Sequence, residues 1–136
     1  MSTDGDAPQP IFIEVGAGEL VDKATILDIK HERIADPAKR ANVARELLAL
    51  EAARAGLRRA LPALAALEAE LKRVNETLWD VEDAIRRCEA SGDFGPRFVE
   101  LARAVYKNND RRAELKKRIN LLSGARIVEE KSYDGE

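Results

Sequence analysis

The chain of 136 residues contains one cysteine, one histidine and one tryptophan, and aromatic side chains make up only 4% of it. A single cysteine cannot form an internal disulfide, so nothing indicates an oxidising compartment. The sequence also lacks the Cys/His spacing of a metal site, a glycine-rich phosphate loop and the nucleophile elbow of hydrolases. We therefore expect no metal, no cofactor and no catalytic residue set of a common kind.

Long apolar runs and an excess of one charge are missing as well. No run approaches the roughly 18 apolar residues of a membrane span. The 23 basic and 25 acidic side chains give a net charge of −2 at pH 7, which indicates binding neither to nucleic acid nor to an anionic membrane. Residues 1–10 are polar and lack the basic start and apolar core of a signal peptide, so we expect a disordered lead and a cytoplasmic protein.

Alanine, leucine and charged residues dominate the rest of the chain. Charged side chains account for 35% of the residues and apolar ones for 45%, a balance that is typical of long helices and coiled coils. The length suits one compact domain with a core of its own. We expect residues 11–133 to form this domain and residues 134–136 to be a short tail.

The first two predicted helices follow local signals for helix ends. The first runs from about residue 19 to residue 34 and has Gly18 as its N-cap. The second begins at Pro37, directly after an aspartate N-cap. We expect it to end in a turn within residues 55–62, because Pro62 cannot continue a helix without losing a hydrogen bond. A kink at Pro62 is the competing interpretation.

The third and fourth predicted helices carry the clearest apolar pattern. In the third, apolar residues recur at alternating steps of three and four and form one continuous seam: Leu64, Leu67, Leu71, Val74, Leu78, Val81, Ile85 and Cys88. Cys88 therefore has the role of a small buried apolar residue. The fourth helix begins at Pro96 and ends near Gly124, where glycine suits a left-handed C-terminal residue. Asn108 and Arg112 interrupt its seam.

The predicted fold is an all-α antiparallel bundle, or coiled-coil hairpin, of about four helices, because short loops make consecutive helices antiparallel neighbours. Near the two ends, residues 11–15 and the pair Ile127 and Val128 are short apolar runs that we expect to pair as a small two-stranded patch on the bundle. Arg112 falls opposite the middle of the third helix, where an unpaired charge is costly. We expect an acid from the first helix or from residues 75–83 to pair with it.

Four stretches of the sequence resemble an uncharacterised bacterial family of small helical proteins: FIEVGAGELVDKATILDIKHERI, NETLWDVEDAIR, RFVELARAVYKNNDRRAELKKRIN and VEEKSY. The resemblance covers residues 11–133, although the family's usual first motif reads closer to SPGELIDKITIL where this chain has GAGELVDKATIL. Members of that family lie near, or are joined to, tetratricopeptide-repeat glycosyltransferases and other surface-polysaccharide genes. The resemblance thus implies a glycosyltransferase or another envelope-assembly protein as the partner. It implies no activity and no catalytic residues.

One face of the third helix is the strongest candidate for a binding site. Asn75, Trp79 and Asp83 lie at helical spacing beside the apolar seam, followed by Arg86. The fourth helix offers side chains of matching chemistry, namely Arg103, Tyr106, Asn109 and Arg112. An aromatic ring with arginine and carboxamide groups can line a site for a sugar or an anion, and the same residue types are typical of protein interfaces. Packing between helices is the third interpretation.

A second candidate is the set of polar residues expected inside the bundle, with Asp22, Lys23 and Arg33 from the first helix beside Asn108 and Arg112. Small helical enzymes of the chorismate-mutase kind bind a dianion between helices, and their chemistry relies on positioning and charge stabilisation. Their arginine spacing does not match here. Their architecture is the basis of our alternative function, a small-molecule enzyme or sensor with an anionic or sugar-phosphate ligand.

Two charged runs have simpler interpretations. Glu76, Asp80 and Asp83 share one helix face and suit a divalent cation, but nearby arginines favour an ion-paired surface with pairs such as Glu82–Arg86. The basic run at residues 107–118 alternates with acids, which favours salt bridges over phosphate binding. We therefore expect a non-enzymatic accessory or adaptor protein of the cytoplasm. It would bind another protein, or itself as a homodimer, in bacterial surface-polysaccharide assembly or glycosylation.

Overall fold

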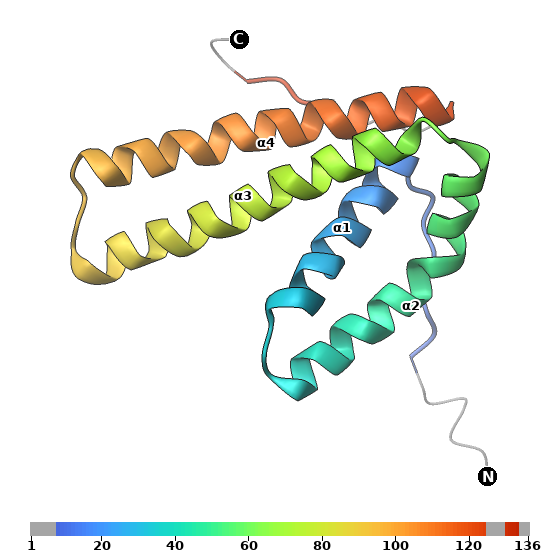
Figure 1. Cartoon of the computed structure of the whole chain (residues 1–136), viewed down its shortest axis with the longest axis horizontal. Helices are drawn as coiled ribbons and strands as arrows, with labels where there is room; N and C mark the ends of the chain where they lie inside the picture. Colours follow the sequence, from blue (N-terminus) through green and yellow to red (C-terminus); the bar gives the residue numbers. More distant parts are fainter. Residues whose placement is uncertain (1–7, 125–129, 134–136) are drawn as a thin grey trace.

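The structure, a computed structural model, describes residues 8–124 and 130–133 and consists of four helices (Figure 1). They are α1 (Ala17–Arg33), α2 (Pro37–Ala60), α3 (Leu64–Ser91) and α4 (Pro96–Ser123). The helices pack together and the described residues contain no strand, so the all-α prediction is confirmed. Within the described residues, no helix combines the length and the apolar composition needed to cross a membrane.

Several helix ends follow the local signals of the sequence. Asp36 accepts a hydrogen bond from the Lys39 N–H at 3.0 Å and caps α2. Gly92 and Gly124 end α3 and α4 in left-handed backbone, with φ of 71° and 67°, a conformation that costs little without a Cβ. The predicted starts of α2 and α4 and the predicted end of α4 are therefore confirmed.

Two predicted boundaries are wrong. α1 begins directly after Gly16, two residues before the predicted start, because Gly18 lies inside the first turn and its N–H is bonded to another helix. α2 continues through Gly56, so most of the predicted turn is helical. One interior glycine costs about 1 kcal/mol, which the surrounding helical residues outweigh. Pro62 does end the helix, since the residue before a proline is driven to extended backbone.

α3 and α4 form one long antiparallel hairpin, and α1 and α2 form a shorter hairpin that covers only part of it (Figure 1). α1 packs against all three other helices, whereas α2 lies mainly on α1 and meets α3 only weakly. The part of the long hairpin next to the loop at residues 92–95 extends past α1 and α2 (Figure 1). We call residues 80–108 the distal half. The molecule thus has four helices at one end and two at the other.

The centre of the four-helix end is a cluster of six buried apolar side chains: Val21, Leu64, Leu71, Val74, Leu115 and Ile119. The members from α3 belong to the predicted seam, and Cys88, also on that seam, is buried as predicted. Burial of each such side chain contributes about 1.5–3 kcal/mol. The cluster joins α1, α3 and α4, and it holds α1 against the long hairpin.

The predicted two-stranded patch is not supported. Residues 11–15 are not part of any strand or helix, and Ile11, Phe12 and Ile13 are almost fully exposed. Ile127 and Val128 lie outside the described residues. A two-stranded ribbon is stable only when it lies on a larger apolar surface. The exposed side chains of residues 11–13 do not meet that condition.

Candidate functional site

A deeply buried polar group of the bundle is the carboxylate of Asp22, whose side chain is 2% exposed. Its two oxygens accept hydrogen bonds from Arg112 Nε at 2.8 Å and Arg112 Nη2 at 2.5 Å. Asn75 Nδ2 donates to Asp22 Oδ1 and to Thr25 Oγ1, each at 3.0 Å, and the Thr25 hydroxyl donates to the Asp22 carbonyl oxygen at 2.8 Å. We call these four residues the Asp22 cluster.

The Asp22 cluster confirms that Arg112 pairs with an acid from the first helix. A bidentate guanidinium and an amide satisfy the buried carboxylate, which would otherwise be costly to bury. The cluster links α1, α3 and α4 through side chains whose positions depend on one another. Asn108, expected in the same interior set, donates instead to the Ala104 carbonyl of its own helix at 2.8 Å. The cluster is best explained as a structural clamp.

A second interhelical contact, at the start of α1, was missed by sequence reasoning. The Gly18 N–H, one of the free donors of the first helical turn, donates to Asn120 Oδ1 of α4 at 2.8 Å. A Cβ at Gly18 would lie 2.2 Å from the Lys116 carbonyl oxygen, so only glycine allows α1 and α4 to approach so closely. The signal in the sequence was the glycine pair of GAG, which marks a close backbone approach as well as a cap.

An open groove lies where α1 and α3 separate. Figure 1 shows that the two helices are close near the start of α1 and diverge toward its end. The space between them is a groove of about 350 Å³ with these lining residues: Ile26, Ile29, Asn75, Leu78, Trp79, Glu82, Asp83 and Arg86. We call it the wedge groove. It brings together the three predicted site residues of α3, namely Asn75, Trp79 and Asp83, with Arg86 at the rim.

Arg33, a secondary candidate, lies beside the wedge groove at the end of α1. Its guanidinium carbon is 5.8 Å from the centroid of the Trp79 ring, within the range of a cation–π contact. Its Nη1 donates to Asp80 Oδ1 at 2.6 Å, and its Nη2 is 4.0 Å from Glu76. These contacts orient the indole and link α1 to α3 across the wide end of the groove.

Two of the three acids of this face of α3, Glu76 and Asp80, are ion-paired as predicted, whereas Asp83 forms no ion pair in the described part of the chain. Arg33 holds Glu76 and Asp80, and Arg86 lies 3.6 Å from Glu82 as the spacing of four residues suggests. In the part of the chain that the structure describes, no group of three or more histidine, cysteine, aspartate or glutamate side chains is placed to hold a metal ion.

The predicted site residues of α4 lie away from the wedge groove. Arg103 lines a different groove, of about 640 Å³ along α4 itself, together with residues such as Val99 and Lys107. Tyr106 is exposed and Asn109 is half-buried, and neither lines the wedge groove. Lys23 is exposed on α1 and lies 3.9 Å from Glu46 of α2. The structure therefore separates Arg103, Tyr106 and Asn109 from the α3 part of the predicted site, whereas Arg112 shares the Asp22 carboxylate with Asn75.

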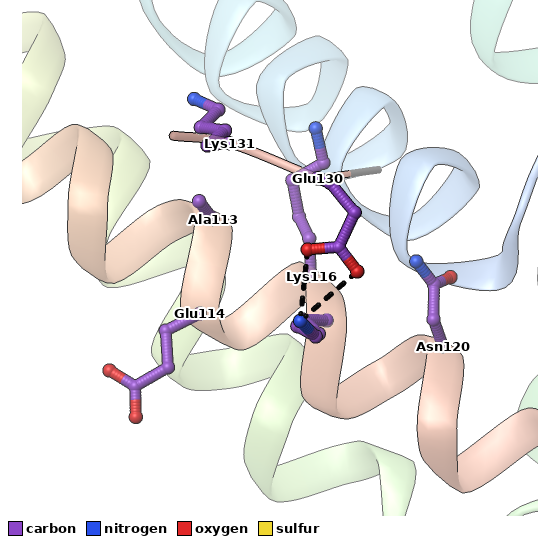
Figure 2. A pocket seen from close by; sticks show the side chains of 7 residues that line it. Ala113, Glu114, Lys116, Asn120, Glu130 and Lys131 are labelled. Carbon is purple, nitrogen blue, oxygen red and sulfur yellow. Dashed lines mark hydrogen bonds and ion pairs between the residues drawn. The ribbon is translucent and has the colours of Figure 1, made fainter. Parts of the chain in front are cut away.

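The basic run of α4 is engaged by acids. Arg111 and Arg118 donate to Glu114 at 3.0 and 2.8 Å, and Arg111 also pairs with Glu70 of α3. The hydrogen bond from Arg111 holds the pKa of Glu70 below its ordinary value of 4.5. Near the end of the helix, Lys117 donates to the carboxylate of Glu130 at 3.2 and 3.3 Å (Figure 2). The predicted salt-bridged surface is confirmed for these residues.

Lys117 and Glu130 line a pocket of about 250 Å³ together with Lys116 and Asn120. Figure 2 shows the Glu130 side chain between those of Lys116 and Asn120. Lys116 Nζ also lies 2.8 Å from Glu19 of α1. Acids hold both lysines of α4 in this pocket, and Lys131 is a third basic residue of its lining. The wedge groove has a more apolar lining and contains the single tryptophan, so it is the stronger candidate for a protein-binding site.

The fold and the groove define a small all-helical protein with a buried polar clamp and an open apolar groove beside its single tryptophan. Residues 11–136 match the model of a protein family described as a family of unknown function (DUF6165), and the chain belongs to this family. The predicted membership of an uncharacterised family is thus confirmed. A search of curated proteins and a search of solved structures each gave no match.

Proposed function

We propose that this chain is a non-enzymatic adaptor protein and that it binds another protein through the wedge groove. The observation that carries the proposal is the composition of the groove. Its lining contains three aliphatic side chains, Ile26, Ile29 and Leu78, and the indole of Trp79. Its rim is charged. An aromatic anchor in an apolar centre with a polar rim is the usual anatomy of a protein-binding hot spot.

The position of Arg112 favours an adaptor over an enzyme for anions. An anion that enters the bundle at Arg112 must compete with Asp22, which holds the guanidinium through two hydrogen bonds. Arg103, the other arginine suggested for such a pocket, lines a different groove. An anion would therefore have to break a buried ion pair, which costs several kcal/mol. The wedge groove needs no such rearrangement to accept an apolar side chain.

The resemblance of the sequence supplies the partner class. Genes for proteins of similar sequence lie near genes for glycosyltransferases and for other steps of surface-polysaccharide assembly. A bacterial glycosyltransferase or envelope-assembly protein is therefore the partner to test first. We also propose that the interaction takes place in the cytoplasm. An adaptor of this kind would recruit or position the enzyme without taking part in its chemistry.

The test is a binding measurement with a purified candidate glycosyltransferase, by biolayer interferometry, and three forms of the full chain. Trp79→Ala removes the anchor of the groove, and we expect binding to weaken by about 2 kcal/mol, or roughly thirtyfold. Leu48→Ala is the matched control, because Leu48 is an exposed apolar residue of α2 that does not line the groove, and it should bind like wild type. Far-UV circular dichroism checks that both variants keep their helices.

A thermal-shift screen with nucleotide sugars and sugar phosphates tests the alternative function, an enzyme or sensor that binds an anion. The adaptor proposal expects no saturable stabilisation. A stabilisation that disappears in Arg103→Ala, which changes an exposed residue, would favour the anion-binding enzyme or sensor instead. Equal binding of the glycosyltransferase by wild type and folded Trp79→Ala would remove the wedge groove from the proposal.

A further inference from the structure

The distal half ends in a pair of aromatic rings, of which Phe94 is exposed and Phe98 is half-buried. Phe94 lies in the loop that joins α3 to α4 and is 56% exposed. Its ring meets that of Phe98 edge to face, with centroids 5.3 Å apart and an interplanar angle of 78°. This end of the hairpin is the farthest from α1 and α2 (Figure 1). Because the two rings already hold each other, little conformational freedom is lost when a partner covers them.

The spacing between this aromatic tip and the wedge groove is fixed by α3. Trp79 and Ser91 are twelve residues apart on one continuous helix, which corresponds to about 18 Å. The tip of a chain therefore cannot enter its own groove. In a two-fold antiparallel pair, however, the tip of the first chain can enter the groove of the second. The tip of the second chain then enters the groove of the first, because tip and groove are equally far apart in both chains.

One residue beside each of the two surfaces carries a charge opposite to that of a residue beside the other. Asp83 is an exposed residue at the rim of the groove, and Arg97 is an exposed residue in the first turn of α4, next to the tip. In the described part of the chain neither of them forms an ion pair within the molecule. Placing the tip in the groove of a second copy brings these opposite charges to the same rim, which favours this register over others.

We infer that the wedge groove receives the Phe94 tip of a second copy of this chain, so that two chains form a two-fold antiparallel dimer through their distal halves. The inference rests on the proposed function in one respect, because both assign the wedge groove to protein docking. It adds the identity of one occupant. In the dimer, the two-helix ends lie side by side and complete a four-helix arrangement that each chain has only at its other end.

The size of the contact indicates a weak dimer. The overlap extends about 20 Å along two helices, each about 10 Å across, which gives a face of about 400 Å². A standard interface buries roughly 800 Å² per partner. We therefore expect dissociation in the micromolar range, so that a larger surface of another protein can displace the second copy from the groove.

Sedimentation velocity on the full chain, from low micromolar to several hundred micromolar, tests the inference. Wild type should change from monomer to dimer over this range. Asp83→Arg and Arg97→Asp each place two like-charge contacts in the dimer, and each should weaken it about tenfold or more. Glu46→Arg reverses a charge on α2, away from both surfaces, and should leave the dissociation constant unchanged. Phe94→Ala should also abolish the dimer, with its helix content checked by circular dichroism.

Mixing the two charge variants gives the decisive result. In a pair formed by Asp83→Arg and Arg97→Asp, one contact has both charges exchanged and the other is native, so the mixture should dimerise more tightly than either variant alone. The double variant in one chain should also dimerise. A wild type that stays monomeric at all concentrations, or a mixture that stays monomeric, would overturn the inference. This assay contains no other protein, so such a result would not contradict the adaptor proposal. That proposal is tested separately by the binding measurement with the glycosyltransferase.

Discussion

Replacing Arg112 with methionine tests the Asp22 cluster and, with it, the packing of α1 on the long hairpin. The two partners are buried unequally, because the side chain of Asp22 is 2% exposed and that of Arg112 is 30% exposed. Removing the arginine leaves a buried carboxylate without its cation. Removing the acid leaves a guanidinium that already reaches water. We therefore expect Arg112→Met to destabilise the fold by about 3–5 kcal/mol and Asp22→Asn by about 1.5–3 kcal/mol.

These values are large beside the total stability of a domain of this size, which is typically about 5–15 kcal/mol. For 136 residues, 1 kcal/mol corresponds to about 3–5 °C in melting temperature, so Arg112→Met should melt at least about 10 °C below wild type. Urea unfolding followed by far-UV circular dichroism and by the fluorescence of Trp79 measures the difference. Agreement of the two signals shows that the transition is two-state.

The control is an exposed ion pair between α1 and α2. Lys23 lies 3.9 Å from Glu46, and both side chains are more than half exposed, so Lys23→Met should change the free energy of unfolding by less than about 1 kcal/mol. The double variant Asp22→Leu/Arg112→Met removes the buried charge altogether and should recover most of the loss. If Arg112→Met cost no more than Lys23→Met, the reasoning that the Asp22 cluster clamps three helices would be refuted.

Three further predictions concern the contacts of α4. Gly18→Ala should destabilise the fold by about 2–3 kcal/mol in urea unfolding, because the added Cβ would meet the Lys116 carbonyl oxygen at 2.2 Å. Asn120→Ala should cost about 1–3 kcal/mol in the same assay, since it leaves the buried Gly18 N–H without an acceptor. Glu70, whose folded pKa is lowered by Arg111, contributes stability above pH 4.5 that is lost as the pH falls through its folded pKa. NMR titration of the Glu70 carboxyl should therefore give a higher midpoint in Arg111→Gln than in wild type.

The fold was predictable from the sequence where the signals are local. The steps of three and four in α3, the proline at the start of α4 and the glycine at its end depend only on neighbouring residues. The start of α1 was not predictable, because its donor is satisfied by Asn120, 102 residues away. The partner of Arg54 was not predictable either. Arg54 lies among the leucines of α2, and it is buried and donates to Asp28 of α1 at 2.6 Å. A charged residue within an apolar stripe is expected to be buried, but the residue that neutralises it depends on how the helices pack.

The site was predictable for one helix only. Asn75, Trp79 and Asp83 share a groove because the period of α3 alone puts them on one face. Arg103 and Tyr106 were assigned to the same site on the assumption that α4 turns them toward that face. The rotation of one helix against another is set by side-chain packing along the whole contact, and here it directs them elsewhere. Nor does the sequence show that α1 diverges from α3 and leaves the groove open.

Asn75 connects the stability of the bundle with the use of the groove. Its amide donates to Asp22 and Thr25 inside the bundle, and the same residue lines the wedge groove. Whatever enters the groove therefore contacts a member of the clamp that sets the angle between α1 and α3. At the wide end of the groove, Arg33 makes the second link between these helices. A partner that fills the space between the two links binds only the folded arrangement, so its binding free energy adds to the free energy of unfolding.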